Sequence, residues 1–269
     1  MTAALRIGCQ TYTWEMRGPE WQGSPDDILD IVAAAGYAGV EFTNHTIGCY
    51  ASAPKRFARA LEKRGLACAG FSFASSGFTD PALFESDLAG AEVALKFCAA
   101  LGTVLCLGGA AAPTREDYDA TLGQAVRFYR AVAEHGARRG VTVCVHPHSH
   151  YGSLLESEEE YDRVLAATAD SGLMFNPDAG HITRGGQDLM TCLRRHRARI
   201  AHVHIKDADA QHHWQALGKG IIAWQTVLDY LRDTDYTGWV VAEEESAEAR
   251  ADPVGAVVGN RQYLRSLGY

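Results

Sequence analysis

The 269-residue sequence has no long hydrophobic run, and this absence limits where the protein can reside. No apolar stretch reaches the roughly 18 residues that a membrane-spanning helix requires, so we expect no membrane partner. The first six residues, Met-Thr-Ala-Ala-Leu-Arg, lack the apolar segment of a secretory signal and lead directly into a strand pattern. The expected compartment is therefore the cytoplasm.

The sequence also lacks paired cysteines. Its seven cysteines are odd in number and contain no Cys-x-x-Cys pair, which argues against a disulfide framework and against a structural zinc site. Cys68, Cys106 and Cys144 lie in apolar strand-like runs, where cysteine behaves as a small hydrophobic residue. We expect most of the cysteines to be reduced core residues.

Clusters of basic residues are absent as well. The formal net charge is −8, and no group of lysines and arginines could follow a phosphate backbone, so a nucleic-acid partner is disfavoured. No tract rich in proline, glycine or serine divides the chain. Because barrels of about 250 residues fold as one unit, we predict a single domain over residues 1–269.

What the sequence does contain is a regular alternation of apolar runs with amphipathic segments. Eight strands are predicted, each followed by a helix, and this is the pattern of a (β/α)₈ TIM barrel. The predicted strands are Leu5–Gln10, Tyr37–Thr43, Leu66–Phe73, Thr103–Gly109, Val141–His146, Gly172–Asp178, Ile200–Lys206 and Gly238–Glu243. The predicted helices are Pro25–Ala35, Pro54–Arg64, Pro81–Ala100, Arg115–Arg139, Ser157–Ala169, Gly186–Arg195, Ala223–Arg232 and Asp252–Ser266.

Polar residues gather at the carboxyl ends of the predicted strands, where TIM barrels build their active sites. Alternation along the fifth strand turns His146 and His148 inward, and alternation along the seventh does the same for His202, His204 and Lys206. The other ends carry Glu41, Asp178 and Glu243. Imidazole and carboxylate groups that converge at strand ends predict a site for one divalent metal ion, either Mn²⁺, Co²⁺, Fe²⁺, Zn²⁺ or Mg²⁺.

Four motifs resemble those of the xylose-isomerase-like TIM barrels, and the resemblance covers the whole chain. They are Val-His-Pro-His-Ser-His-Tyr-Gly-Ser (145–153), Asn-Pro-Asp-Ala-Gly-His (176–181), His-Val-His-Ile-Lys-Asp (202–207) and Gly-Trp-Val-Val-Ala-Glu (238–243). The resemblance implies that Asp178, His204 and Glu243 are metal ligands and that His181 contacts substrate. It also implies chemistry in which the metal stabilises an enediolate.

The fifth strand departs from the common family pattern, which is Glu-x-His. Here His146 stands at the first position and His148 at the second, and this looks like the inosose dehydratase branch of the family. Three residues qualify as the fourth metal ligand: His146, His148 and Glu156. Our predicted metal set is His146, Asp178, His204 and Glu243.

The resemblance favours a metal-dependent lyase that dehydrates a keto-polyol or keto-sugar. Glu243 is the expected base, and His146 or His148 is the expected acid for the departing hydroxyl group. The alternatives are a sugar isomerase or epimerase, of ketose or hydroxypyruvate type, with the same metal site, and a non-catalytic sugar-binding barrel or partner subunit. DNA repair of the endonuclease IV type fits poorly, because that activity needs more metal ligands and a basic groove.

Substrate contacts are expected from the strand ends and the loops beyond them. We predict that His181, Lys206, Glu156, Glu41 and Trp14 contact a small carbohydrate or polyol. The longest non-periodic piece, Ala208–Gly220, is expected to be a functional lid. Aromatic residues in such loops could equally lie in a subunit interface, so a homo-oligomer stays open.

Overall fold

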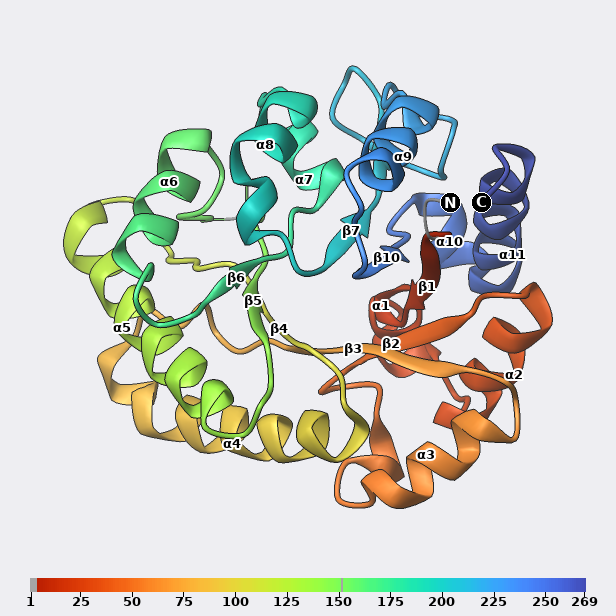
Figure 1. Ribbon diagram of the computed structural model, residues 1–269, viewed down its shortest axis with the longest axis horizontal. Helices are drawn as coiled ribbons and strands as arrows, with labels where there is room; N and C mark the ends of the chain where they lie inside the picture. Colours follow the sequence, from red (N-terminus) through yellow and green to blue (C-terminus); the bar gives the residue numbers. More distant parts are fainter. Residues whose placement is uncertain (1–3, 151) are drawn as a thin grey trace. The chain divides into compact units, whose positions relative to one another are not determined.

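The computed structural model describes residues 4–150 and 152–269. The first three residues, which begin the N-terminal segment discussed above, lie outside the described residues. So does Tyr151, which belongs to the motif at 145–153. Eight parallel strands alternate with helices, and the order in the sheet is β6-β5-β4-β3-β2-β1-β10-β7 (Figure 1). This is the predicted (β/α)₈ TIM barrel fold.

The chain divides by compactness into two units. The first comprises residues up to Gly70 together with His202–Tyr269, and the second comprises Phe71–Ala201. Strand β3 (Ala67–Phe73) passes from one unit to the other. Its Ala67 amide donates to the Ala38 carbonyl in the first unit, and its Phe71 amide donates to the Val104 carbonyl in the second. The prediction of a single domain stays a prediction.

In the first unit, β1 is paired in parallel with strands on both sides. It forms a ladder with β10, in which Gly8 is opposite Val241, and a second ladder with β2, in which Gln10 is opposite Glu41. Strand β10 also pairs with β7, where Val241 is opposite His204. The strands of this unit are β1 (Arg6–Gln10), β2 (Gly39–Thr43), the first part of β3, β7 (Val203–Ile205), β8 (Asp207–Ala208), β9 (Trp214–Gln215) and β10 (Trp239–Ala242).

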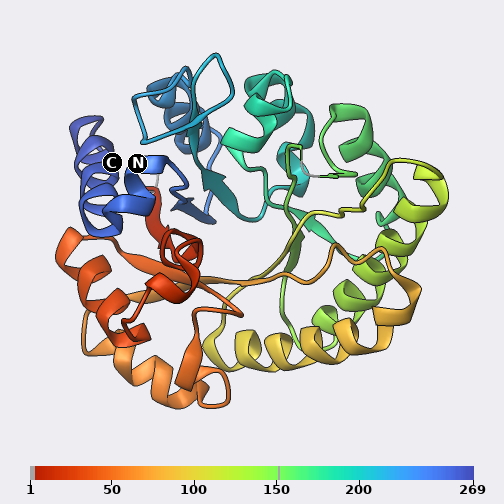
Figure 2. The ribbon, with the colours of Figure 1, turned by 180° about the vertical axis from the view of Figure 1, so that it is seen from behind.

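The helices of the first unit begin and end at residues suited to those places. Ser24 and Asp27 form a capping box at the start of α2, Pro25 occupies its first turn, and Gly36 ends it with a left-handed backbone at φ +85°. Helix α2 packs against α3 and α11, as Figures 1 and 2 show. The α-helices are α1 (Tyr12–Glu15), α2 (Pro25–Ala35), α3 (Pro54–Glu62), α9 (Trp224–Asp233), α10 (Ala247–Ala251) and α11 (Pro253–Ser266).

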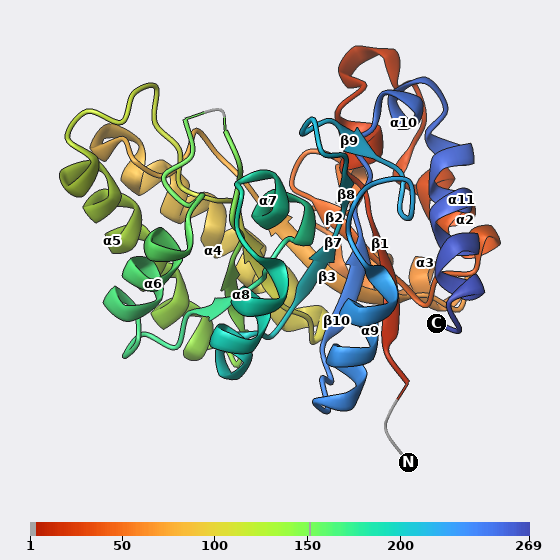
Figure 3. The ribbon, with the colours of Figure 1, turned by 90° about the horizontal axis from the view of Figure 1, so that it is seen from above.

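The second unit continues the same alternation. Its strands are the last part of β3, β4 (Leu105–Leu107), β5 (Val143–Val145) and β6 (Met174–Phe175), and each pairs in parallel with the next. Its helices are α4 (Phe84–Leu101), α5 (Tyr118–Ala137), α6 (Glu158–Ala167), α7 (Ala179–Arg184) and α8 (Leu189–His196). Helices α4 and α5 pack side by side, as Figure 3 shows from above.

Each unit has an apolar core of its own. In the first, Ala69 of β3 and Trp239 and Val241 of β10 form a buried cluster. In the second, the rings of Phe78 and Phe128 stack with their centroids 4.4 Å apart. Aromatic packing of this kind adds to the large apolar area that such side chains bury.

The structure differs from the sequence prediction in its short elements. The segment predicted as an irregular lid contains an antiparallel hairpin, in which Ala208 is opposite Trp214. Helix α7 begins directly after Asp178, inside a segment for which no helix was predicted. Elements of two to six residues are too short to show a hydrophobic period. The remaining short turns are 3₁₀ helices at Gly18–Glu20, Gly48–Tyr50, Pro81–Leu83 and Arg197–Arg199.

The structure bears on two further expectations, that the cysteines are reduced core residues and that no segment spans a membrane. All seven cysteines are free, and five are buried, whereas Cys49 is exposed and Cys68, predicted in the core, is half-buried. Within residues 4–150 and 152–269, no helix combines the length and the apolar character that crossing a membrane would demand.

Candidate active site

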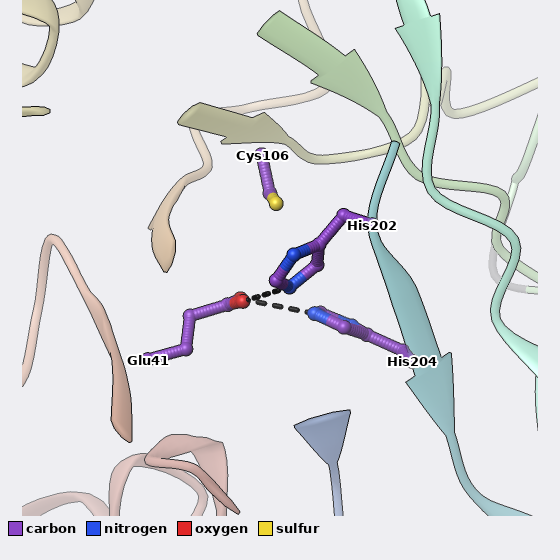
Figure 4. A group of neighbouring side chains, drawn as sticks. All are labelled: Glu41, Cys106, His202 and His204. Atoms are coloured by element: carbon purple, nitrogen blue, oxygen red, sulfur yellow. Dashed lines mark hydrogen bonds and ion pairs between the residues drawn. The ribbon is translucent and has the colours of Figure 1, made fainter. Parts of the chain in front are cut away.

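In the first unit, one buried carboxylate lies against two imidazoles from the neighbouring strand ends. Glu41 of β2 and His202, just before β7, are fully buried, and His204 is nearly so. The Glu41 Oε2 atom lies 2.6 Å from His202 Nε2, and Oε1 lies 3.0 Å from His204 Nε2 (Figure 4). Val203 lies between these two histidines in the sequence and Ile205 follows His204. Both are buried apolar residues that alternate with the histidines along the strand, as predicted.

The charges of this group are coupled. Burial alone would raise the pKa of Glu41, but the neighbouring His204 and His202 side chains lower that pKa well below its usual range. Burial alone would lower the pKa of His204, but Glu41 and Glu243 raise it to about 10. The carboxylate is therefore ionised, and both Nε2 atoms that face it carry protons.

The other side of His204 faces the end of β10. Its Nδ1 atom lies 2.9 Å from Glu243 Oε2, and the other oxygen of Glu243 lies 3.1 Å from the Lys206 ammonium. Lys206 also pairs with Glu245 and lies under the ring of Trp214, with Nζ 4.8 Å from the ring centroid. A buried lysine held by two carboxylates and an aromatic face has a fixed position.

Glu245 is a carboxylate of unusual basicity in this group. Burial raises its pKa to about 7, Lys206 opposes the shift, and Glu243 adds to it. Glu244, between the two, faces the helix layer and accepts a hydrogen bond from Asn260 Nδ2 of α11 over 2.7 Å. Glu243 and Glu245 therefore contact Lys206 in the site, whereas Glu244 contacts helix α11.

In the second unit, the end of β5 meets the start of α7. His146 Nε2 lies 3.3 Å from Asp178 Oδ2, and both residues are buried. The second carboxylate oxygen, Oδ1, accepts a hydrogen bond from the His181 amide over 2.8 Å and so caps α7. This cap fixes the direction in which the Asp178 carboxylate points.

Three imidazoles gather beside this pair. The ring centroids of His146, His148 and His181 lie 4.8 to 5.5 Å from one another, and each pair meets edge to face. The Nδ1 atom of His181 accepts from the amide of Ser149 over 3.0 Å, and the Nδ1 atom of His148 accepts from the amide of Gly109 over 3.1 Å. Both rings therefore carry a proton on Nε2.

Glu156 and Trp14 were also predicted to contact substrate. Glu156 pairs with His150, with 2.8 Å between Oε1 and Nδ1. Trp14 is fully buried with its ring 6.3 Å from that of Trp21, and its indole nitrogen has no hydrogen-bond partner among the described residues. A buried unpaired N–H is costly unless something accepts from it, so a substrate oxygen is a chemically suitable partner.

Each unit therefore supplies one buried imidazole–carboxylate pair that suits a divalent metal ion. A cation with ligands at about 2.1 Å holds neighbouring ligand atoms about 3 to 3.4 Å apart. The separation of 3.3 Å in the His146–Asp178 pair lies within this range, and the 2.9 Å in the His204–Glu243 pair lies just below it. Mixed nitrogen and oxygen donors suit the first-row metals and Zn²⁺.

Sequence reasoning missed several residues that hold these groups in place. Ser149 orients His181, Asp207 organises the loop after β7, and Gly70 leaves room for Glu41. No local sequence pattern indicates the role of any of these three residues. The Gly-Gly pair at 108–109 was a usable signal, because a Cβ on Gly109 would lie 2.6 Å from His148 Nδ1.

Residues 29–267 match the family model described as xylose isomerase-like TIM barrel. The chain belongs to this family. Among curated relatives, it is 33% identical to the inosose dehydratase of Erwinia tasmaniensis (strain DSM 17950 / CFBP 7177 / CIP 109463 / NCPPB 4357 / Et1/99), over 52% of this chain and 53% of the relative. It is 27% identical to the inosose dehydratase of Geobacillus thermodenitrificans (strain NG80-2), over 89% of this chain and 88% of that one. The first alignment thus spans only about half of the relative's length.

Solved structures of family-like barrels agree in fold. The 3-keto-D-glucoside 4-epimerase YcjR from E. coli superposes with a TM-score of 0.79 at 20% identity, over 98% of this chain and all of that one. The IolI protein with a bound zinc atom superposes with a TM-score of 0.81 at 12% identity, over 97% of this chain and 96% of that one. These likenesses show a shared barrel fold.

Proposed function

We propose that the protein is a divalent-metal-dependent dehydratase that acts on a keto-polyol or keto-sugar. The observation that carries the proposal is the cluster of His146, His148 and His181, in which His146 stands at the end of the fifth barrel strand where the common family pattern has a carboxylate. The curated relatives named inosose dehydratase support the same reaction class. Their names also suggest the substrate class, a cyclic polyol with one keto group.

The proposed metal ligands are Asp178, His204, Glu243 and His146. Of the three candidates for the fourth position, His146 is supported by its contact with Asp178, whereas His148 Nδ1 accepts from Gly109 and Glu156 pairs with His150. When bound, the cation supplies Lewis-acid stabilisation of the negative charge that develops on a substrate carbonyl oxygen.

The chain's own residues then divide the proton transfers between them. Glu243 takes the proton from the carbon next to the carbonyl, and its second oxygen is held by the Lys206 ammonium. His148 donates a hydrogen bond from its Nε2–H to the departing hydroxyl group, and the proton that Glu243 has taken completes the water that leaves, so His148 stays neutral with its Nδ1 atom accepting from the Gly109 amide. His181, Lys206, Glu156 and Trp14 are the proposed substrate contacts.

Epimerisation or isomerisation is the alternative, and the similarity in fold to a 3-keto-D-glucoside 4-epimerase favours keeping it. In that reaction the proton removed by Glu243 returns to the substrate, and no carbon–oxygen bond breaks. The two reactions therefore differ in whether water is lost.

Incubation of metal-loaded protein with 2-keto-inositol or a 3-keto-sugar distinguishes them. Dehydration gives a dicarbonyl or enone, with new ultraviolet absorbance and a mass lower by one water. Epimerisation in deuterated water gives no loss of water but places deuterium on carbon, and that result with no dehydrated product would overturn the proposal. Glu243→Gln should abolish either reaction, whereas Glu248→Gln, the same exchange at an exposed position of α10, should abolish neither.

A further inference from the structure

Glu41 is a buried charge for which the proposed reaction has no use. It lies on β2, its side chain is fully buried, and each of its two oxygens lies against a histidine nitrogen. An ionised carboxylate is costly to bury unless its surroundings compensate for the lost hydration. The Nε2–H groups of His202 and His204 supply this compensation.

The two donors come from successive inward positions of one strand. His202 Nε2 donates to Oε2 and His204 Nε2 donates to Oε1, so each carboxylate oxygen holds one ring (Figure 4). An ionised carboxylate can only accept hydrogen bonds, so the proton on His204 is retained at Nε2. The atom at the other side of that ring, Nδ1, is the one that lies 2.9 Å from Glu243 Oε2.

The neighbouring strand leaves space for this arrangement. A Cβ atom on Gly70 of β3 would lie 2.6 Å from Glu41 Oε2 and 3.2 Å from His202 Cε1. A glycine is therefore required beside the carboxylate for steric reasons, although its backbone needs no unusual conformation. Glycine inside a strand weakens the strand and often marks such a close approach.

We propose that Glu41 is a positioning residue, which holds the Nε2 proton of His204 and so presents His204 Nδ1, beside Glu243, to a divalent metal ion. The proposal rests on the metal site of the proposed function and assigns Glu41 a role other than the substrate contact that its sequence position suggested. Carboxylates that orient a ligating histidine raise its basicity and fix its tautomer, and their loss typically lowers metal affinity about 10- to 100-fold.

Metal affinity, measured by competition with a chelator, tests the proposal without any substrate. Glu41→Gln keeps the side-chain volume but can accept from only one of the two rings with full strength, so Zn²⁺ and Co²⁺ affinity should fall at least tenfold. Glu62→Gln is the matched control, since Glu62 is an exposed residue at the end of α3. An unchanged affinity in Glu41→Gln, or an equal loss in Glu62→Gln, would overturn the proposal.

Gly70→Ala tests the same arrangement without removing a polar group, because the added methyl displaces Glu41 and His202. In zinc-loaded protein with ¹⁵N-labelled histidine, the wild type should show a solvent-protected Nε2 proton on His204. Gly70→Ala and Glu41→Gln should weaken or lose that resonance together with affinity. If the resonance stays in both variants, Glu41 does not hold the ring. A wild type that binds metal but dehydrates nothing would contradict the proposed function alone.

Discussion

The indole nitrogen of Trp224 donates a hydrogen bond to Asp207 Oδ2 over 2.8 Å, and this bond joins α9 to β8. Asp207 is fully buried and accepts four further hydrogen bonds, from the amides of Ala208, Gly218, Gly220 and Ile222. One carboxylate therefore ties together both ends of the loop that carries Trp214. Asp207 is thus a polar anchor for this loop.

Replacement of Asp207 by asparagine should loosen this loop. The new amide group would face several N–H donors that no longer find an acceptor, and a buried donor left unsatisfied costs about 1–3 kcal/mol. We expect the free energy of unfolding to fall by about that amount and the amides of Gly218 and Gly220 to exchange faster with deuterium. Asp233→Asn, at an exposed residue of α9, is the control. Unchanged exchange at both glycines would show that other contacts hold the loop.

Replacement of Lys206 by methionine should affect turnover and leave metal content intact. The ammonium lies between Glu243 and Glu245, so its removal leaves the buried Glu243 and the half-buried Glu245 carboxylates without their shared cation and takes away a charge suited to a developing oxyanion. We expect turnover to fall at least about tenfold, as is usual when a charged contact is lost. Lys219→Met, at an exposed position in the same loop, should behave like the wild type. Unchanged kinetics in Lys206→Met would assign this lysine to a structural role.

The barrel was predictable from the sequence because its signals are local. Alternation in Val203–Ile205 marks a strand, and Ser24, Pro25 and Gly36 mark the ends of a helix, so each element can be placed without knowledge of its neighbours. The same alternation predicted that His204 and Lys206 lie on one side of their strand.

The supports of the site were not predictable in this way, because they depend on contacts distant in sequence. Glu41 meets His204 across 163 positions, and nothing near Glu41 indicates which histidine it meets. Gly70 is needed for the space it leaves, and Asp207 for the donors that loop closure brings to it. Such roles become visible only when the strands are placed side by side.

Replacement of Glu245 by glutamine should change how stability depends on pH. Burial raises the pKa of Glu245 to about 7 in the folded protein, above its ordinary value of 4.5, so the folded state holds this proton more tightly. Its contribution is complete below about pH 4.5 and is lost as the pH rises through about 7. In metal-free protein, wild-type stability should therefore decline from pH 5 to pH 8 relative to Glu245→Gln, measured by urea unfolding. Parallel curves for the two proteins would contradict this assignment.

Two substitutions of Asp178 should separate its two roles. Oδ1 caps α7 by accepting from the His181 amide, and Oδ2 lies against His146, where we propose that it binds metal. Asparagine keeps an acceptor for the cap but loses the charge, so Asp178→Asn should lose metal on elemental analysis with a nearly unchanged free energy of unfolding in metal-free protein. Asp178→Ala should lose metal equally and also about 0.5–2 kcal/mol of stability, because the cap is gone.

The cap of the next helix provides the control for this pair. Asp188 is exposed and caps α8 by accepting from the Thr191 amide over 2.6 Å, so Asp188→Ala should lose stability through the same mechanism and keep its metal. If Asp178→Asn retained full metal occupancy, Asp178 would serve only as a helix cap, and the metal would have to be held by other groups. Loss of metal in both asparagine and alanine variants of Asp178, with retention in Asp188→Ala, would instead assign the charge of Asp178 to the metal site.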